Sequence, residues 1–342
     1  MESDPAARRK VVLVTGGFGR MGTALINRLL GLGWNVRVLD RRESVARELQ
    51  SLPEADHFHC DLSSSSPANH DALVSACRGA DIIYHLAGTS YGHGSSYKRM
   101  LSLNLLPTQN LLSACSEANG GQSGHVTRVV FAGSTSVYGH GRPGEVLDER
   151  SATRPKSIYA KSKLLAEEAI KAAVEKDPSL KYTILRITAI YGKGYDESFF
   201  KIFRMLRSGK FRYLGDGKNH LTLVNIEDVV NGMVAVAESS RCENKTYNLT
   251  DGESHTVRGL IEAVSAEMGM EPPTKHAGRI IGKLLARFSG ATSDELDFLF
   301  SDRVVSTDLI RRDAGFIPSV PITKGIHDLA ARFADSEAQD KG

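Results

Sequence analysis

Short apolar runs recur through the first half of the chain, and polar residues do not alternate with apolar ones inside them. The runs are residues 11–14, 36–39, 81–87, 128–132 and 182–187, with a weaker one at 57–60. Uninterrupted Val, Ile and Leu are typical of strands buried on both faces of a parallel sheet. The pattern therefore predicts parallel strands at these positions.

The segments between these runs carry apolar residues at helical spacing. Residues 20–30, 96–117 and 157–175 are the predicted helices. Strands that alternate with helices form right-handed βαβ units. The first half is therefore predicted to fold as an α/β structure with a doubly wound parallel sheet.

The pattern changes after about residue 191, where glycine-rich turns separate shorter elements. Helical patterns return at residues 227–239, 256–269 and 280–288. Because open α/β sheets bind ligands at the carboxyl ends of their strands, we expect a smaller C-terminal α/β lobe that packs there and binds the substrate. The predicted divisions are a main domain at 1–190, a lobe at 191–334 whose segments can interleave with it, and a frayed polar tail at 335–342.

Charge and composition exclude several classes of function. The 43 basic and 40 acidic residues are interspersed and give a net charge of +3. The sequence therefore shows no cluster of positive charge that would predict binding to nucleic acid or to an anionic membrane. Apolar runs are far shorter than the roughly 18 residues of a membrane-spanning helix, and residues 1–10 lack a signal peptide's apolar stretch. We therefore expect a cytoplasmic protein. The cysteines share no CxxC spacing and are interpreted as buried thiols; they are Cys60, Cys77, Cys115 and Cys242.

A glycine-rich turn follows the first predicted strand and opens into a helix. It reads Thr15-Gly16-Gly17-Phe18-Gly19-Arg20-Met21-Gly22. Gly16 permits a tight turn, Gly19 lets the backbone approach a pyrophosphate, and Gly22 lets the helix pack close to its strand. The helix N-terminus supplies N–H groups for the phosphates. The turn therefore predicts a dinucleotide site, and residues 1–190 become a Rossmann-type NAD(P)-binding domain.

Acidic residues after the second and third strands indicate which dinucleotide binds. Asp40 ends the second strand, where a carboxylate accepts ribose hydrogen bonds and repels a 2′-phosphate, so NAD is favoured. Arg41 and Arg42 follow directly, and either could pair with the 2′-phosphate of NADP. Asp61, beside Leu62, could accept the adenine amino group or cap a helix.

Catalytic chemistry is predicted near the end of the fourth buried run. Tyr159 and Lys163 lie one helical turn apart, and an ammonium lowers the pKa of a nearby tyrosine toward the working pH. Ser134 and Thr135 follow the buried run 128–132, where a hydroxyl can donate to a substrate oxygen. Spacing alone does not decide between the two hydroxyls.

Together these motifs resemble the extended short-chain dehydrogenases/reductases, the NAD-dependent epimerase/dehydratase family. That group contains sugar-nucleotide epimerases, 4-ketoreductases and relatives of 3β-hydroxysteroid dehydrogenases. The resemblance extends from about residue 11 to 326. Besides the glycine turn and Tyr159-x-x-x-Lys163, the motifs that carry it are His85-Leu86-Ala87-Gly88, Asn104, Ser134 before Val137-Tyr138-Gly139, Leu185-Arg186, Val224-Asn225-Ile226-Glu227-Asp228, and Ala314-Gly315-Phe316.

The resemblance implies roles for individual residues. Ser134, Tyr159 and Lys163 would form the catalytic triad, with Thr135 as an alternative holder of the substrate oxygen. It also implies a homodimer that pairs the helices at 96–117 and 157–175. The cofactor-binding residues it implies, together with those derived above, are Gly16, Phe18, Gly19, Arg20, Met21, Gly22, Asp40, Arg41, Asp61, Leu62, Leu86, Ala87, Gly88, Asn104, Tyr159, Lys163 and Ile187.

The chain departs from this family where the substrate binds. Thr135 and Ser136 replace the acidic pair of sugar-nucleotide dehydratases, which argues against dehydration. Ala189 and Leu221 stand where many sugar-nucleotide enzymes carry an asparagine and an arginine that contact the diphosphate. His93, in a glycine-rich loop, could serve a polar lid or carry protons. No metal site is predicted, since His57 and His59 lack further ligands.

Three functions remain open from the sequence. The first is an NAD(P)-dependent epimerase or oxidoreductase that acts on a secondary alcohol carbon, most simply of a nucleotide sugar. The second is a reductase or dehydrogenase of another bulky alcohol or ketone, such as a steroid-like one. The third, a dinucleotide sensor without catalysis, is disfavoured because Tyr159 and Lys163 are both present.

Overall fold

The computed structural model describes residues 9–41, 54–89, 96–120, 125–278 and 302–339. Their backbone divides into two compact units built from interleaved segments. The first unit comprises residues 1–133, 161–185 and 233–246, and the second comprises 134–160, 186–232 and 247–342. The predicted helix at 280–288 lies outside the described residues.

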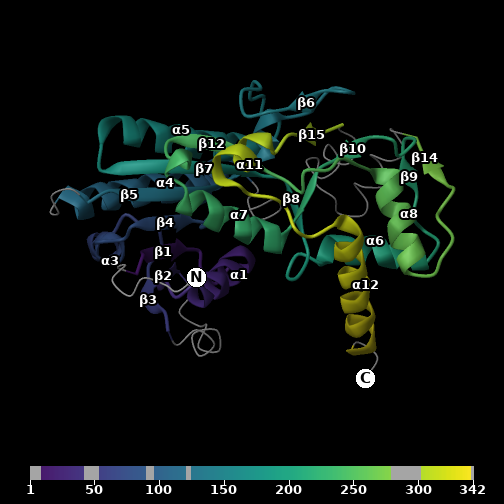
Figure 1. Cartoon of the computed structure of the whole chain (residues 1–342), viewed down its shortest axis with the longest axis horizontal. Coiled ribbons are helices and arrows are strands. Elements are labelled where there is room, and N and C mark those ends of the chain that lie inside the picture. The colour runs from purple at the N-terminus through teal and green to yellow at the C-terminus, as the bar shows by residue number, and fades with distance from the viewer. Residues whose placement is uncertain (1–8, 42–53, 90–95, 121–124, 279–301, 340–342) are drawn as a thin grey trace. The chain divides into compact units, whose positions relative to one another are not determined.

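A seven-stranded sheet is the centre of the first unit, and its strand order is β12-β7-β5-β4-β1-β2-β3 (Figure 1). The pairs β1–β2, β1–β4, β2–β3 and β4–β5 are all parallel. The strands are β1 (Val11–Thr15), β2 (Asn35–Asp40), β3 (Asp56–His59), β4 (Ile82–His85), β5 (Thr127–Ser134), β7 (Leu180–Ile187) and β12 (Lys245–Leu249). This confirms the predicted doubly wound, Rossmann-like fold.

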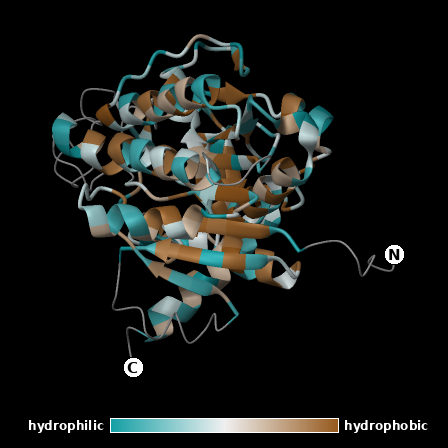
Figure 2. Cartoon of the chain, turned by 90° about the vertical axis from the view of Figure 1, so that its left-hand side faces the viewer, coloured by the Kyte–Doolittle hydropathy of each residue, from teal (hydrophilic) through white to brown (hydrophobic). Residues whose placement is uncertain are grey.

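Helices cover both faces of this sheet, which is why its central strands are mostly apolar, whereas the edge strands β3 and β12 carry more polar residues. Figure 2 shows the central strands coloured mostly brown, the hydrophobic end of its scale. The helices of this unit are α1 (Arg20–Gly31), α3 (Pro67–Cys77), α4 (Tyr97–Gly120) and most of α5 (Ile158–Lys176). The sequence did not predict α3, which Ser66 caps by accepting a hydrogen bond from the Asn69 backbone N–H.

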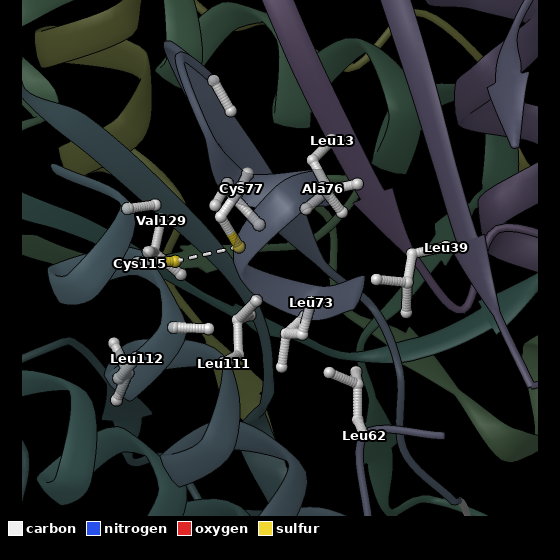
Figure 3. Packing of buried hydrophobic residues seen from close by; sticks show 14 of the residues in the cluster. Leu13, Leu39, Leu62, Leu73, Ala76, Cys77, Leu111, Leu112, Cys115 and Val129 are labelled. Carbon is white, nitrogen blue, oxygen red and sulfur yellow. Dashed lines mark hydrogen bonds between the residues drawn. The ribbon is translucent and has the colours of Figure 1, made fainter. Parts of the chain in front are cut away.

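One apolar cluster joins α3 and α4 to the sheet (Figure 3). Leu13 and Leu39 reach it from the strands, and Leu111 reaches it from α4. Cys77 and Cys115 meet inside the cluster with their sulfur atoms 3.6 Å apart. All four cysteines are buried free thiols, as predicted.

The second unit is built from shorter elements around an aromatic core. That core includes Tyr191, Phe203 and Phe333. Two-stranded sheets pair β8 (Ala189–Tyr191) with β11 (Leu223–Asn225), β10 (His220–Leu221) with β13 (His255–Thr256), β9 (Tyr213–Leu214) with β14 (His276–Ala277), and β6 (Val146–Leu147) with β15 (Val304–Val305). The helices are α6 (Glu197–Arg207), α8 (Val257–Glu267), α11 (Asp308–Ala314) and α12 (Ile322–Gln339), with α7 (Ile226–Glu238) running from this unit into the first.

The C-terminal segment differs from the predicted frayed tail. Helix α12 continues to Gln339, and Glu337 near its end forms ion pairs with Arg204 and Arg207 of α6. None of the helices that the structure describes is long and apolar enough to span a membrane.

Candidate active site

The glycine turn between β1 and α1 is held so tightly that side chains do not fit. Gly16 has a φ of +67°, and a Cβ atom there would lie 2.9 Å from the backbone of Ala87. A Cβ atom on Gly22 would lie 2.5 Å from the carbonyl oxygens of Gly16 and Gly17. Gly19 caps α1 without any side-chain hydrogen bond. The turn therefore presents bare backbone at a helix N-terminus, which fits the pyrophosphate of a dinucleotide.

Asp40 ties the end of β2 to this turn. Its side chain is 8% exposed, and its Oδ2 atom accepts a hydrogen bond of 3.1 Å from the backbone N–H of Phe18. The Phe18 ring stacks on His57 of β3 at 5.9 Å. Arg20 and Arg41 are exposed and Met21 is half-buried, whereas Arg42 and His93 lie outside the described residues. The Asp40 carboxylate therefore lies beside the glycine turn, a position compatible with the predicted binding of the ribose.

Asp61 organises the turn after β3 and does not cap α3. Its Oδ1 atom accepts hydrogen bonds from the backbone N–H and the hydroxyl of Ser63, at 2.9 and 2.7 Å. Burial opposes ionisation of Asp61, but the Ser63 hydrogen bonds together with the charges of Arg41 and His59 outweigh it and lower the pKa of the carboxyl. Leu62 is buried beside it. The alternative role as an N-cap is excluded, since Ser66 fills it.

A buried histidine at the end of β4 links three elements of the first unit. His85 contacts the Thr15 hydroxyl through Nδ1 at 2.9 Å and the Thr108 hydroxyl through Nε2 at 3.0 Å. Because the Thr108 hydroxyl donates to the Asn104 carbonyl, the His85 Nε2–H must donate to Thr108. Burial, and then the Lys163 charge, lower the pKa of His85 to about 3. The imidazole is therefore neutral at physiological pH.

This network supports the segment 86–89, where the resemblance places cofactor contacts. The Ala87 N–H donates to the Thr15 hydroxyl at 3.2 Å. Asn104 accepts a hydrogen bond from the Thr89 N–H through Oδ1 at 2.8 Å and donates one to Ser162 through Nδ2 at 2.9 Å. The Asn104 Oδ1 atom would lie 2.8 Å from a Cβ atom on Gly88. Asn104 therefore connects the loop after β4 to α5.

Lys163 is buried at the carboxyl end of β5. Its Nζ atom donates to the Ala132 carbonyl oxygen at 2.9 Å and lies 4.8 Å from the centre of the Phe131 ring. Burial lowers the pKa of Lys163 to about 8, although the Glu167 carboxylate acts in the opposite direction. Tyr159, half-buried, precedes it by one turn of α5. The two side chains share one face of the helix, as the spacing predicts.

The hydroxyl residues at the carboxyl end of β5, Ser134 and Thr135, belong to the second unit. The Ser134 Oγ atom accepts hydrogen bonds from the backbone N–H and the hydroxyl of Ser136, at 3.2 and 2.9 Å, which leaves the Ser134 hydroxyl hydrogen able to donate. Thr135 is only 2% exposed and begins the short 3₁₀ helix η1 (Thr135–Tyr138). Ile187, at the end of β7, is buried. Ser134 is thus the better placed of the two candidate donors.

Two positions of the second unit lack the polar side chains that the resemblance leads one to expect there. Leu221 belongs to the apolar cluster that contains Tyr191 and Phe203, and Ala189 packs against the same cluster. Neither can contact a diphosphate by charge or amide hydrogen bonding. The nearby motif residue Arg186 is also occupied, since it donates to the Tyr138 hydroxyl at 3.0 Å.

Sequence reasoning missed three polar residues of the first unit. Thr15, Thr108 and Glu167 are all fully buried, and none of them is assigned a role by the motifs. The signal for Glu167 is its place one turn beyond Lys163 on a helix with a buried face. No signal in one sequence joins Thr15 to Thr108.

The chain is similar in sequence and in fold to several known proteins. The sequence pattern described as the NAD dependent epimerase/dehydratase family matches residues 12–250. The chain is 28% identical to a 2-alkyl-3-oxoalkanoate reductase of Stenotrophomonas maltophilia, over 94% of this chain and 99% of that protein. It is 25% identical to an N-acetyl-alpha-D-glucosaminyl-diphospho-ditrans,octacis-undecaprenol 4-epimerase of Escherichia coli O157:H7, over 80% and 77%. The structure of MoeE5 in complex with UDP-glucose and NAD is similar with a TM-score of 0.73 and 25% identity, over 96% and 99% of the two chains.

Proposed function

Because the chain belongs to the NAD dependent epimerase/dehydratase family, we propose that it transfers hydride between NAD and a secondary alcohol or ketone carbon. Tyr159 moves the proton, Ser134 holds the substrate oxygen and Lys163 supplies the positive charge. NAD, when bound, accepts the hydride or returns it. One observation carries the proposal: the buried Lys163 ammonium lies at the carboxyl end of β5, one helical turn from Tyr159.

The first unit supplies the groups that bind the dinucleotide. The backbone N–H groups at the start of α1 face the phosphates, with Gly16 and Gly22 keeping side chains out of the way. Asp40 accepts hydrogen bonds from the adenosine ribose, which favours NAD over NADP. Asn104 holds the loop after β4 in place.

A bulky ketone or alcohol without a nucleotide is the favoured substrate. Leu221 and Ala189 occupy the places of two expected diphosphate contacts, and both pack in or against an apolar cluster. The Stenotrophomonas maltophilia relative is named a reductase of an oxoalkanoate, which is such a substrate. A sugar linked to a diphosphate is the second candidate, supported by the name of the Escherichia coli relative, a 4-epimerase.

Identification of the bound nucleotide separates these two candidates. Freshly purified protein is denatured, and any released nucleotide is identified by chromatography. Stoichiometric NAD that appears only on denaturation favours an epimerase, which returns the hydride to its own intermediate. Protein that binds added NADH reversibly favours a reductase, and NADH oxidation is then screened by absorbance against 2-alkyl-3-oxoalkanoates and 3-ketosteroids.

Tyr159→Phe tests the central chemical role. Removing an acid–base group costs roughly 10²–10⁴-fold in rate, so we expect at least a ~100-fold loss of turnover with NAD binding retained. Tyr182→Phe is the matched control, because Tyr182 lies near the amino end of β7, away from the carboxyl ends of the strands where the site is proposed. Turnover that survives in Tyr159→Phe contradicts the proposal.

A further inference from the structure

Helix α5 carries a third ionisable residue on the same face as Tyr159 and Lys163. Glu167 follows Lys163 by four residues, so the three side chains share one face of the helix. Glu167 is completely buried, whereas its neighbour Glu168 is exposed. Carboxylates are rarely buried this fully unless another group uses their charge.

Both buried side chains lie against the end of β5. The Lys163 Nζ atom donates to the Ala132 carbonyl oxygen. The next residue is Gly133, and a Cβ atom there would lie 3.1 Å from the Glu167 Oε1 atom. Gly133 thus leaves room for the Glu167 carboxylate. Gly133 directly follows Ala132, whose carbonyl oxygen accepts the hydrogen bond from Lys163.

The other groups around Lys163 do not neutralise its charge. His85 faces it from β4 and is neutral, with a pKa of about 3. Asn104 of α4 is uncharged, and Phe131 offers only its ring. Tyr159, on α5, is the residue whose proton Lys163 is proposed to influence. Among the described residues, Glu167 is the acid that raises the pKa of Lys163 against the effect of burial.

We propose that Glu167 is a positioning residue whose buried carboxylate keeps the Lys163 ammonium charged and fixed at the end of β5. Without it, burial favours the neutral amine, and the Tyr159 phenolate loses the positive charge that stabilises it. The step is a shift of one proton from Lys163 to water, and no covalent bond changes. The catalytic part of this proposal rests on the proposed role of Tyr159. The part that concerns the charge of Lys163 is independent of that role.

A direct titration of Lys163 tests the inference. The full-length protein is labelled with ¹³C at the lysine Cε atoms, and the Lys163 resonance is assigned by its absence in Lys163→Arg. An opposite charge nearby changes a pKa by about 1 unit or more. We therefore expect the Lys163 midpoint to fall by about 1 pH unit in Glu167→Gln and to stay unchanged in the exposed control Glu168→Gln. An unchanged midpoint in Glu167→Gln overturns the proposal.

A second variant covers the case in which Glu167→Gln does not fold. Glu167→Asp keeps the charge but withdraws it by one methylene, so the Lys163 midpoint should fall by less than in Glu167→Gln and still measurably. A midpoint equal to that of the wild-type protein in Glu167→Asp overturns the proposal in that case.

The pH dependence of turnover separates an electrostatic role from a merely structural one. In Glu167→Gln the alkaline limb of the profile, where Lys163 loses its proton, should move down by about the same 1 unit. A uniform loss of rate with both limbs unmoved contradicts the proposed role. If Tyr159→Phe retains turnover, the proposed function fails, while the titration of Lys163 still decides the role of Glu167.

Discussion

Substitution of Gly22 by alanine should weaken both the fold and cofactor binding. A Cβ atom at this position lies 2.5 Å from the carbonyl oxygens of Gly16 and Gly17. These are backbone atoms, so the turn itself must shift. Overpacking of this kind costs about 1–3 kcal/mol, and the usual gain of up to about 1 kcal/mol from replacing a helical glycine offsets only part of it. Because two backbone carbonyl oxygens lie this close, we use the upper part of the range, about 2–3 kcal/mol, and a net loss of about 1–2 kcal/mol remains.

The matched control lies at the other end of the same helix. A Cβ atom on Gly31 would meet no described atom within 4 Å beyond its own helix and chain neighbours, so Gly31→Ala should be neutral or slightly stabilising. Calorimetry should show Gly22→Ala melting several degrees lower, at about 2–4 °C per kcal/mol for a unit of this size. NADH titration should show at least a roughly tenfold weaker Kd, about 1.4 kcal/mol. Equal melting temperatures and affinities for the two variants refute the steric argument.

Two further predictions concern buried polar groups. Unfolded chains protonate His85 below its usual pKa of 6.5, whereas the folded protein resists protonation until about pH 3, so stability should fall as the pH drops through this window. Between about pH 7 and 5, His85 should reduce the free energy of unfolding by about 2 kcal/mol. Urea unfolding at the two pH values should show this reduction in the wild-type protein and not in His85→Gln. An identical reduction in both proteins contradicts a neutral His85. Asp40→Ala should weaken NADH binding by about tenfold, the loss of a charged hydrogen bond, and NADPH binding by less, as measured by fluorescence titration. An equal loss for both dinucleotides would contradict the role of Asp40 in selecting NAD.

The central strands of the main sheet were predictable because they are rich in uninterrupted apolar residues, whereas the edge strand β12 was not predicted because it contains several polar residues. The runs at 11–14 and 128–132 became β1 and β5 with small changes at their ends. Helix α3 was missed although Ser66 and Pro67 form a recognisable start, because its apolar residues do not follow a clear helical period. The two-residue strands of the second unit are too short for any period to be recognised, and long-range pairing decides them.

For the site, too, local patterns were predictable from the sequence and long-range contacts were not. Gly22 and the pair Tyr159 and Lys163 were found from the sequence because their chemistry depends on local spacing, one turn or one helix long. His85 and Thr108 are separated by 23 residues, and His85 and Thr15 by 70, so their hydrogen bonds exist only once β1, β4 and α4 are assembled. Buried polar groups that pair at long range leave no periodic trace in a sequence.

The buried network also explains how a lysine can remain charged in an apolar setting. Burial alone drives Lys163 toward the neutral amine, and a protonated His85 would drive it further in that direction. Because burial, and then the Lys163 charge, keep His85 neutral, Glu167 is the charged group that opposes the effect of burial on Lys163. A charged residue introduced at position 85, as in His85→Lys, should therefore lower the Lys163 midpoint, whereas His85→Gln should leave it near that of the wild-type protein.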